Sequence, residues 1–326
     1  EFKLCKIWAE VLGTEEVSIT DNFFHAGGDS ISCLQVLYKI RNAGLAQLRA
    51  MDFYKNPTVM TLAQLIETHT ESEDVVKADQ GQITKSFGTL TIQDEFFRAN
   101  MQKPNHYNQA FTIKLPENHN ISSEKLNDAV KKLAHHHDIL RCVYKDKLHH
   151  CCDEAPVEVL NLQGLVADEA LLTKLQASLN IEKGPLWRVV LHSENKLCFI
   201  FHHLVIDVVS WRILAEDMRS LLNGRSLGSK TCSYKQWVEH VKTYAEKHGK
   251  AQAPFWTKML NGIDQSLLPS ATSAPVESKL EIDADLTSRM LSDASKAYNT
   301  EVNDILLAAL GRALSITTGS KVNTVS

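Results

Sequence analysis

The chain of 326 residues is 44% apolar and 23% charged, as expected of a globular protein long enough for two or three domains. Its formal net charge is −4, and no basic patch is interleaved with aromatic residues, so we expect no nucleic-acid partner. The sequence shows neither an apolar run of membrane-spanning length nor a signal-peptide pattern at its N-terminus, so we expect no membrane partner.

The cysteines bear on the compartment. They number seven, an odd count, and are scattered mostly within apolar segments, which is typical of reduced thiols rather than of a disulfide framework. We therefore expect free thiols and a cytoplasmic location. The positions are Cys5, Cys33, Cys142, Cys151, Cys152, Cys198 and Cys232.

Apolar residues at helical spacing predict four short helices in the first part of the chain. The first begins near Leu4 and ends at Gly13, and the second begins at Ile31. A short third helix is expected at 51–55, and Thr58 is a suitable N-cap for the fourth. Four helices in so short a stretch predict a small bundle that is better suited to an adaptor than to an enzyme with a pocket.

The second helix is preceded by Gly27, Gly28, Asp29 and Ser30. The glycines leave Ser30 exposed, and the free N–H groups of a helix N-terminus favour a phosphodiester, although serine is also a common N-cap. The whole string D-N-F-F-x-x-G-G-D-S-I resembles peptidyl carrier proteins. This resemblance implies 4′-phosphopantetheine bound covalently to Ser30, with Gly28 and Asp29 in the attachment motif. An aspartate before the serine is typical of carriers that precede epimerization domains.

Two histidine-rich stretches, 135–137 and 149–152, invite interpretation as a metal site. We expect a strand over 139–144, and adjacent residues on a strand point to opposite faces. Zinc ligands also usually come as spaced pairs from two elements. We therefore predict no metal site.

Strands are expected at 110–115 and 187–192, and the second forms a hairpin with a buried strand at 197–201. That buried strand leads into a tight connection that carries His202, His203 and Asp207. A helix follows, with apolar residues at helical spacing, and ends at Asn223-Gly224. Side chains at such a connection are held by the scaffold and open to a cleft, and a neutral imidazole accepts a proton near pH 7. Taken alone, however, two adjacent histidines fit a packed core equally well.

The pattern H-H-x-x-x-D followed by V-S-W resembles the condensation superfamily of nonribosomal peptide synthetases, which are relatives of chloramphenicol acetyltransferase. The string V-S-W-R-I-L is closer to the epimerization branch than to the branch that forms peptide bonds. The resemblance implies that His203 is the catalytic acid/base and that His202 supports the loop. It also implies that Asp207 is structural and pairs with Arg141 of an H-H-D-x-L-R element. Val208 replaces the family's usual glycine, so the loop must use ordinary dihedrals or be reshaped.

The rest of the sequence predicts helices at 233–248 and 254–260, a proline- and serine-rich bridge at 267–278, a strand at 279–282 and helices at 286–298 and 302–317. The string beginning at Thr300 resembles the third motif of the epimerization branch. The next motif, E-G-H-G-R-E, whose glutamate is the expected second acid/base, does not occur, so we expect the second lobe to be incomplete here.

The fold implied is a small four-helix carrier bundle followed by an α/β domain of two lobes, like chloramphenicol acetyltransferase. The expected boundaries are 1–71 for the carrier, 72–82 for a linker, 83–266 for the N-terminal lobe and 279–326 for the start of the C-terminal lobe.

The function implied is inversion, L to D, of the Cα of an aminoacyl or peptidyl thioester by deprotonation and reprotonation. The alternatives are a condensation domain that forms peptide bonds and a catalytically inactive module that only docks the carrier. The expected partners are the thioester substrate, an adenylation domain upstream and a condensation domain downstream in the same synthetase.

Overall fold

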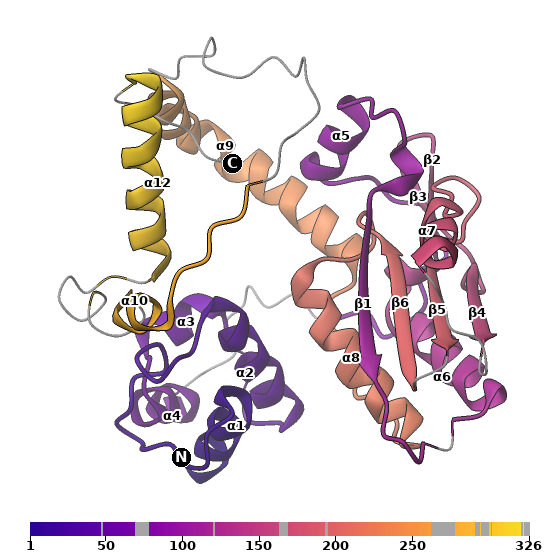
Figure 1. The fold of residues 1–326 in the computed structure, drawn as a ribbon, viewed down its shortest axis with the longest axis horizontal. Helices are drawn as coiled ribbons and strands as arrows, with labels where there is room; N and C mark the ends of the chain where they lie inside the picture. Colours follow the sequence, from indigo (N-terminus) through magenta and orange to yellow (C-terminus); the bar gives the residue numbers. More distant parts are fainter. Residues whose placement is uncertain are drawn as a thin grey trace.

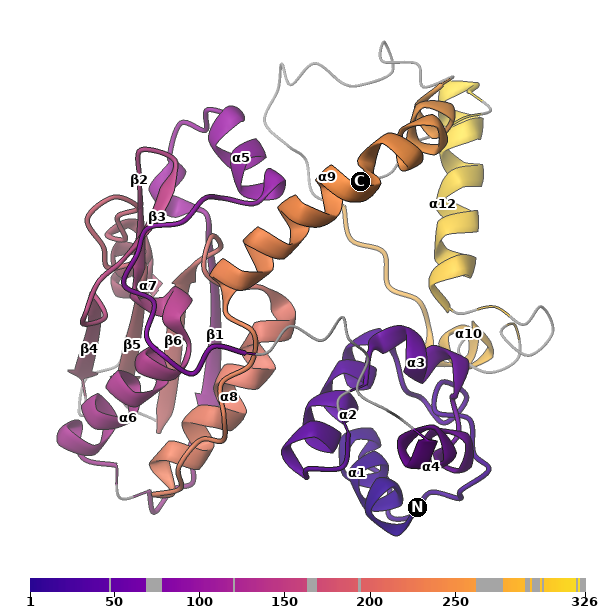
Figure 2. The same cartoon turned by 180° about the vertical axis from the view of Figure 1, so that it is seen from behind.

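A computed structural model gives the fold, which Figures 1 and 2 show from opposite sides. Most of the predicted linker, the bridge up to residue 277 and most of the helix predicted at 286–298 lie outside the residues that it describes. The described residues are 1–46, 48–68, 78–119, 121–162, 169–192, 195–261, 278–290, 294, 300, 302–320 and 322.

The carrier consists of α1 (Phe2–Leu12), α2 (Ser30–Asn42), α3 (Ala50–Lys55) and α4 (Val59–Thr68), which confirms the four predicted helices. Its core is built on three aromatic rings that are fully buried, those of Trp8, Phe23 and Phe53. The Phe23 ring lies edge-on to both neighbours, with centroid distances of 4.8 Å to Trp8 and 5.0 Å to Phe53. Aromatic burial therefore stabilises a bundle that is too short for a deep aliphatic core.

The two glycines before α2 are needed for different reasons. Gly27 has φ of 97°, a left-handed conformation that side chains rarely adopt. Gly28 packs so closely on Phe23 that a Cβ would lie 2.3 Å from Cε1 of the ring and 2.7 Å from its main-chain oxygen. The glycine pair thus turns the chain and lets α2 begin directly against the aromatic core.

The main sheet has the strand order β1-β6-β5-β4 (Figure 1). Strand β6 (Lys196–His202) pairs antiparallel with β1 (Asn108–Lys114) on one side and with β5 (Trp187–His192) on the other, and β4 (Val157–Leu162) pairs in parallel with β5. The predicted β5–β6 hairpin and the β1 strand are confirmed, whereas the sequence analysis did not predict β4.

Helices cover both faces of this sheet. On one face α6 (Ser123–His136) and α8 (Val208–Leu222) pack on alternate strand residues such as Val189, Phe199 and Phe201. On the other, α7 (Glu169–Ala177) packs on the intervening ones, which include Val190 and Ile200. Burial on both faces explains why β5 and β6 are apolar with little alternation.

A two-stranded sheet, β2 (Cys142–Lys145) with β3 (Leu148–Cys151), follows a short 3-10 helix, η2 (Asp138–Arg141). The strand expected at 139–144 is therefore half helical. Cys142 and Cys151 are directly opposite across the pair and form a disulfide. Free thiols were expected at both positions, and that expectation is wrong, because separation in the sequence does not reveal cross-strand register.

A small helical segment, α5 (Thr91–Arg98) and η1 (Pro104–His106), leads into β1. The helices expected at 233–248 and 254–260 are one continuous helix, α9 (Tyr234–Leu260), with Pro254 inside it. After the bridge come α10 (Ala284–Arg289) and α12 (Val302–Thr318), and described residues 279–282 form no strand. No helix in the described part of the chain is long and apolar enough to cross a membrane.

We predict that Gly28→Ala lowers the free energy of unfolding of the carrier by about 1–3 kcal/mol, because the added methyl group overlaps the Phe23 ring. Hydrogen exchange of the α2 amides measures this locally. Gly228→Ala is the control, since its Cβ would meet nothing within 4 Å, and its effect should stay within about 0.5 kcal/mol. Equal protection of α2 in both variants would contradict the packing argument.

Candidate active site

His203 lies immediately after β6 and is held by main-chain groups. Its N–H donates to the carbonyl of Tyr107 at 2.8 Å, and its ring stacks on the Tyr107 ring with centroids 5.2 Å apart. Nδ1 lies 2.9 Å from the carbonyl oxygen of Ile206, which can only accept, so Nδ1 carries the proton. In the neutral ring Nε2 is then the basic nitrogen, and it lies 2.8 Å from the amide nitrogen of Gln109.

His202 is oriented in the opposite way. It is fully buried, its Nε2–H donates to the carbonyl of Pro104 at 2.8 Å, and its Nδ1 accepts from the N–H of Leu204 at 3.2 Å. Because Nδ1 accepts this bond, it carries no proton and the ring is neutral, and burial lowers the pKa of His202 in the same sense. The two histidines thus leave the strand on opposite sides, His202 inward and His203 toward β1.

A network of buried hydrogen bonds holds the connection in place at Leu204. Its carbonyl accepts from Tyr144 Oη at 3.0 Å and from Gln93 Nε2 at 3.2 Å, and Gln93 also donates to the Tyr144 hydroxyl. Burial lowers the pKa of His149 to about 4, and this neutral ring donates through Nδ1 to the carbonyl of Gly88 at 2.9 Å. No prediction from the sequence singled out Gln93, Tyr144 or His149 for this role.

The predicted pair of Asp207 with Arg141 is wrong. Asp207 is exposed and caps α8, accepting from the N–H of Ser210 at 2.8 Å and from its hydroxyl at 2.6 Å. Arg141 is fully buried and pairs instead with Asp138, three residues away in η2, whose other oxygen accepts from Lys230 at 3.0 Å. Asp138 lies in the same helical turn as Arg141, so this pair forms without bringing together two distant loops, which a pair with Asp207 would require.

Val208 is the first residue of α8. It is not among the residues of positive φ, so the connection uses ordinary dihedrals, as expected for a β-branched residue.

Ser30 is exposed at the first turn of α2, and its hydroxyl accepts a hydrogen bond from Tyr54 Oη at 2.8 Å. Asp29 is the N-cap: it accepts from the N–H and the hydroxyl of Ser32, both at 2.7 Å. Burial alone would raise the pKa of Asp29, but these bonds and the charge of Arg212 together lower it. An exposed serine beyond a glycine turn that admits no Cβ fits the covalent attachment of a phosphopantetheine arm.

The carrier contacts the lobe along α8. Arg212 donates to Gln35 Oε1 at 3.1 Å, and further along both helices Tyr38 Oη donates to Asp217 at 3.1 Å. Positions increase together along α2 and α8, so the helices run in the same direction here. The Ser30 end of α2 therefore lies toward the end of α8 that follows the histidine connection (Figures 1 and 2).

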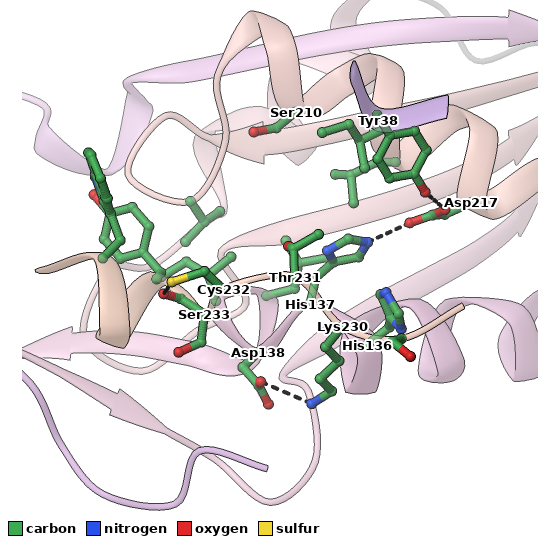
Figure 3. Close-up of a pocket in the computed structure, with 18 of the residues that line it drawn as sticks. Tyr38, His136, His137, Asp138, Ser210, Asp217, Lys230, Thr231, Cys232 and Ser233 are labelled. Carbon is green, nitrogen blue, oxygen red and sulfur yellow. Dashed lines mark hydrogen bonds and ion pairs between the residues drawn. The ribbon is translucent and has the colours of Figure 1, made fainter. Parts of the chain in front are cut away.

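A cavity of about 300 Å³ lies at this junction (Figure 3). Asp217 is central to it: one oxygen accepts from Tyr38 and the other lies 2.7 Å from Nε2 of His137. The described lining includes Val205 of the connection and Ser210 in the first turn of α8 but not His203, so the cavity lies beside the candidate catalytic residue rather than around it.

His136, His137 and Asp217 also bring potential metal ligands within 4.8 Å of one another. This convergence was not predicted from the sequence, because the histidines were expected to lie beside a strand, whereas His136 ends α6 and His137 caps it. Ligands of a tetrahedral zinc ion at about 2.1 Å lie only about 3.4 Å apart, and both oxygens of Asp217 are already engaged. Asp217 therefore connects Tyr38 of the carrier to His137 of the lobe through hydrogen bonds.

Family models match both parts of the chain: the phosphopantetheine attachment site over residues 3–66 and the condensation domain over residues 90–326. Among curated proteins, a linear gramicidin synthase of Brevibacillus parabrevis is 33% identical over 100% of this chain. Bacitracin synthase 2 of Bacillus licheniformis is 33% identical over 95% of it. The alignments cover only 7% and 13% of those two proteins.

Two solved structures show the same architecture. The epimerization domain from the third module of tyrocidine synthetase B matches with a TM-score of 0.60 and 26% identity, over 74% of this chain and 60% of that one. The condensation enzyme VibH matches with a TM-score of 0.55 and 20% identity, over 70% of this chain and 58% of that one, and supports the fold alone.

We predict that Asp138→Asn lowers the free energy of unfolding by about 3–5 kcal/mol, because Arg141 is then left buried without its counter-charge. Asp207→Asn is the matched variant and should cost less than about 1 kcal/mol, since asparagine caps a helix about as well as aspartate. Urea unfolding of the two variants measures the difference. A larger loss in Asp207→Asn would restore the pair that the sequence analysis predicted.

Proposed function

Since the chain belongs to the condensation-domain family of nonribosomal peptide synthetases, with a phosphopantetheine carrier ahead of that domain, we propose that it is a carrier–epimerization segment. It inverts the Cα of an aminoacyl or peptidyl thioester from L to D. We propose the unit boundaries 1–71, 72–82, 83–266 and 279–326. The adenylation domain upstream and the condensation domain downstream in the same synthetase, and the cytoplasmic location, belong to this proposal.

The observation that carries the proposal is the tautomer of His203. The carbonyl of Ile206 holds the proton on Nδ1 and leaves Nε2 as a base at the end of the central strand β6. Abstraction of a proton from Cα needs a positioned base of this kind. His202 is buried and has both ring nitrogens engaged, so it orients the connection and does not reach substrate.

His203 takes the proton from Cα. The Cα–H bond breaks, the proton moves to Nε2, and the electron pair delocalises into the thioester carbonyl. The phosphopantetheine arm on Ser30 supplies the thioester that acidifies this proton. Return of a proton on the opposite face needs a second group, which the family resemblance assigns to the glutamate of the motif that this sequence lacks. His203 alone therefore supports abstraction and exchange of the proton.

Epimerization is favoured over condensation by independent features. The solved epimerization domain is 26% identical to this chain, and the strings G-G-D-S and V-S-W are those of that branch. The carrier also lies along α8 with Ser30 toward the catalytic connection, which is the geometry a carrier needs to serve the domain that follows it. Tethering in one chain keeps the arm at a high effective concentration near His203.

We predict that Ser30 is the attachment site of phosphopantetheine. Incubation with coenzyme A and a phosphopantetheinyl transferase should add one pantetheine mass, and Ser30→Ala should abolish the addition. Ser32→Ala is the control on the same helix and should still be loaded, because the Ser32 hydroxyl serves only the N-cap. A mass increase that persists in Ser30→Ala would overturn the assignment.

We predict that His203→Ala lowers the exchange of the α-proton with deuterated solvent by about 10²–10⁴-fold, because the general base is removed. The assay uses the chain continued through a complete second lobe, with an L-aminoacyl pantetheine on Ser30. His203→Gln keeps a polar side chain of similar length without a basic nitrogen and should be equally inactive.

The alternatives give different results in the same assay. Peptide-bond formation with an added aminoacyl acceptor, without α-proton exchange, would show a condensation domain. Absence of both reactions would indicate a docking module. If the extended chain forms the D-product and the 326-residue chain does not, the added segment contains the second acid/base.

A further inference from the structure

Gln109 on β1 approaches the basic nitrogen of His203 directly. Its register partner in β6 is Phe201, so the two strands place its side chain beside the connection that follows β6. The amide Nε2 lies 2.8 Å from Nε2 of His203. Tyr107, two residues earlier, holds the same imidazole by a main-chain bond and by ring stacking, so one segment of the chain contacts His203 in three ways.

The orientation of the Gln109 amide depends on the protonation of His203. When His203 is neutral with its proton on Nδ1, Nε2 has only a lone pair, and the NH2 group of Gln109 must face it. When His203 is protonated, both nitrogens donate, and the carbonyl oxygen of Gln109 is the group that satisfies Nε2–H.

The amide oxygen of Gln109 has no other role. Oε1 is buried and has no hydrogen-bond partner among the described residues. A buried acceptor without a partner costs free energy, so the arrangement with the NH2 group facing the ring is destabilised. Turning the amide removes this cost by giving Oε1 a donor. A turn of the terminal torsion exchanges NH2 and oxygen without moving the rest of the side chain.

Resting on the proposed function, we infer that Gln109 is a positioning residue that couples the orientation of its amide to the protonation of His203. In the resting state its N–H holds the base in the Nδ1–H tautomer. Substrate displaces this N–H from the single in-plane lone pair of Nε2 before the Cα proton is taken. After the transfer, Nε2–H donates to Oε1, which stabilises the imidazolium through a charge-assisted bond.

The chain offers a matched control on the same strand. Asn108 is adjacent to Gln109, so its side chain points to the opposite face, where its Nδ2 donates to the carbonyl of Gln176 in α7 at 2.9 Å. Asn108→Leu removes an amide from β1 without touching His203.

The first experiment is ¹⁵N NMR of the free 326-residue chain with labelled histidine. We expect the neutral His203 ring to show Nδ1 protonated and Nε2 unprotonated. Gln109→Glu should raise the midpoint of the His203 titration by about one pH unit or more, because a carboxylate then faces the ring. Gln109→Leu should lower it by removing the acceptor of the charged form, and Asn108→Leu should leave it unchanged.

The second experiment measures α-proton exchange in the extended, loaded protein. Gln109→Leu should slow exchange on the order of 10- to 100-fold through loss of ring orientation. The exchange rate increases with pH as His203 loses its proton. Gln109→Glu should move this increase to higher pH, by the same amount as the NMR midpoint. A neutral wild-type ring protonated on Nε2, or midpoints unchanged in both Gln109 variants, overturns the inference. Exchange that persists in His203→Ala overturns the proposed function instead, so the two failures are distinct.

Discussion

Main-chain carbonyl groups fix both histidines of the site, and the rest of the geometry depends on this constraint. A carbonyl oxygen only accepts, so the contact with Pro104 puts the proton of His202 on Nε2, and the contact with Ile206 puts that of His203 on Nδ1. Two adjacent residues of the same type thereby carry opposite tautomers. The chemical difference between them comes from backbone direction at the end of a strand rather than from neighbouring charges, so it survives changes in surface charge and in salt.

Such carbonyl groups are useful only if they do not move, and the sheet supplies that rigidity. Strand β6 is central, paired on both edges and covered on both faces, so its exit point is fixed by burial on every side. Gln93 and Tyr144 then hold the carbonyl of Leu204, one residue beyond the histidines. Because these groups are buried, each unsatisfied partner would carry a desolvation cost, and the network resists local opening of the connection.

The sequence was informative where the signal was local. Helical spacing, glycine stops and the apolar run before His202 predicted the carrier helices, the β5–β6 hairpin and α8. Contacts between distant segments were not accessible in the same way. Arg141 was assigned to Asp207 by resemblance, although Asp138 is available within the same turn. The β2–β3 register that pairs Cys142 with Cys151 cannot be read from the spacing of the cysteines in the sequence. The role inferred for Gln109 likewise depends on the pairing of β1 with β6, which periodicity does not specify.

The junction between carrier and lobe illustrates how weak polar contacts suffice once the partners are tethered. Exposed contacts such as Gln35 with Arg212 contribute about 0–1 kcal/mol each, and the bond of Tyr38 to the charged carboxylate of Asp217 contributes about 1.5–3 kcal/mol. As a complex of separate molecules this would dissociate readily. A linker, however, holds the carrier at an effective concentration in the millimolar range, where a few kcal/mol populate the docked state appreciably without making it permanent. His137 keeps a bond to Asp217 when Tyr38 leaves, so undocking exposes one carboxylate oxygen to water rather than stranding a buried charge. A carrier that must visit several catalytic domains requires this kind of reversible contact.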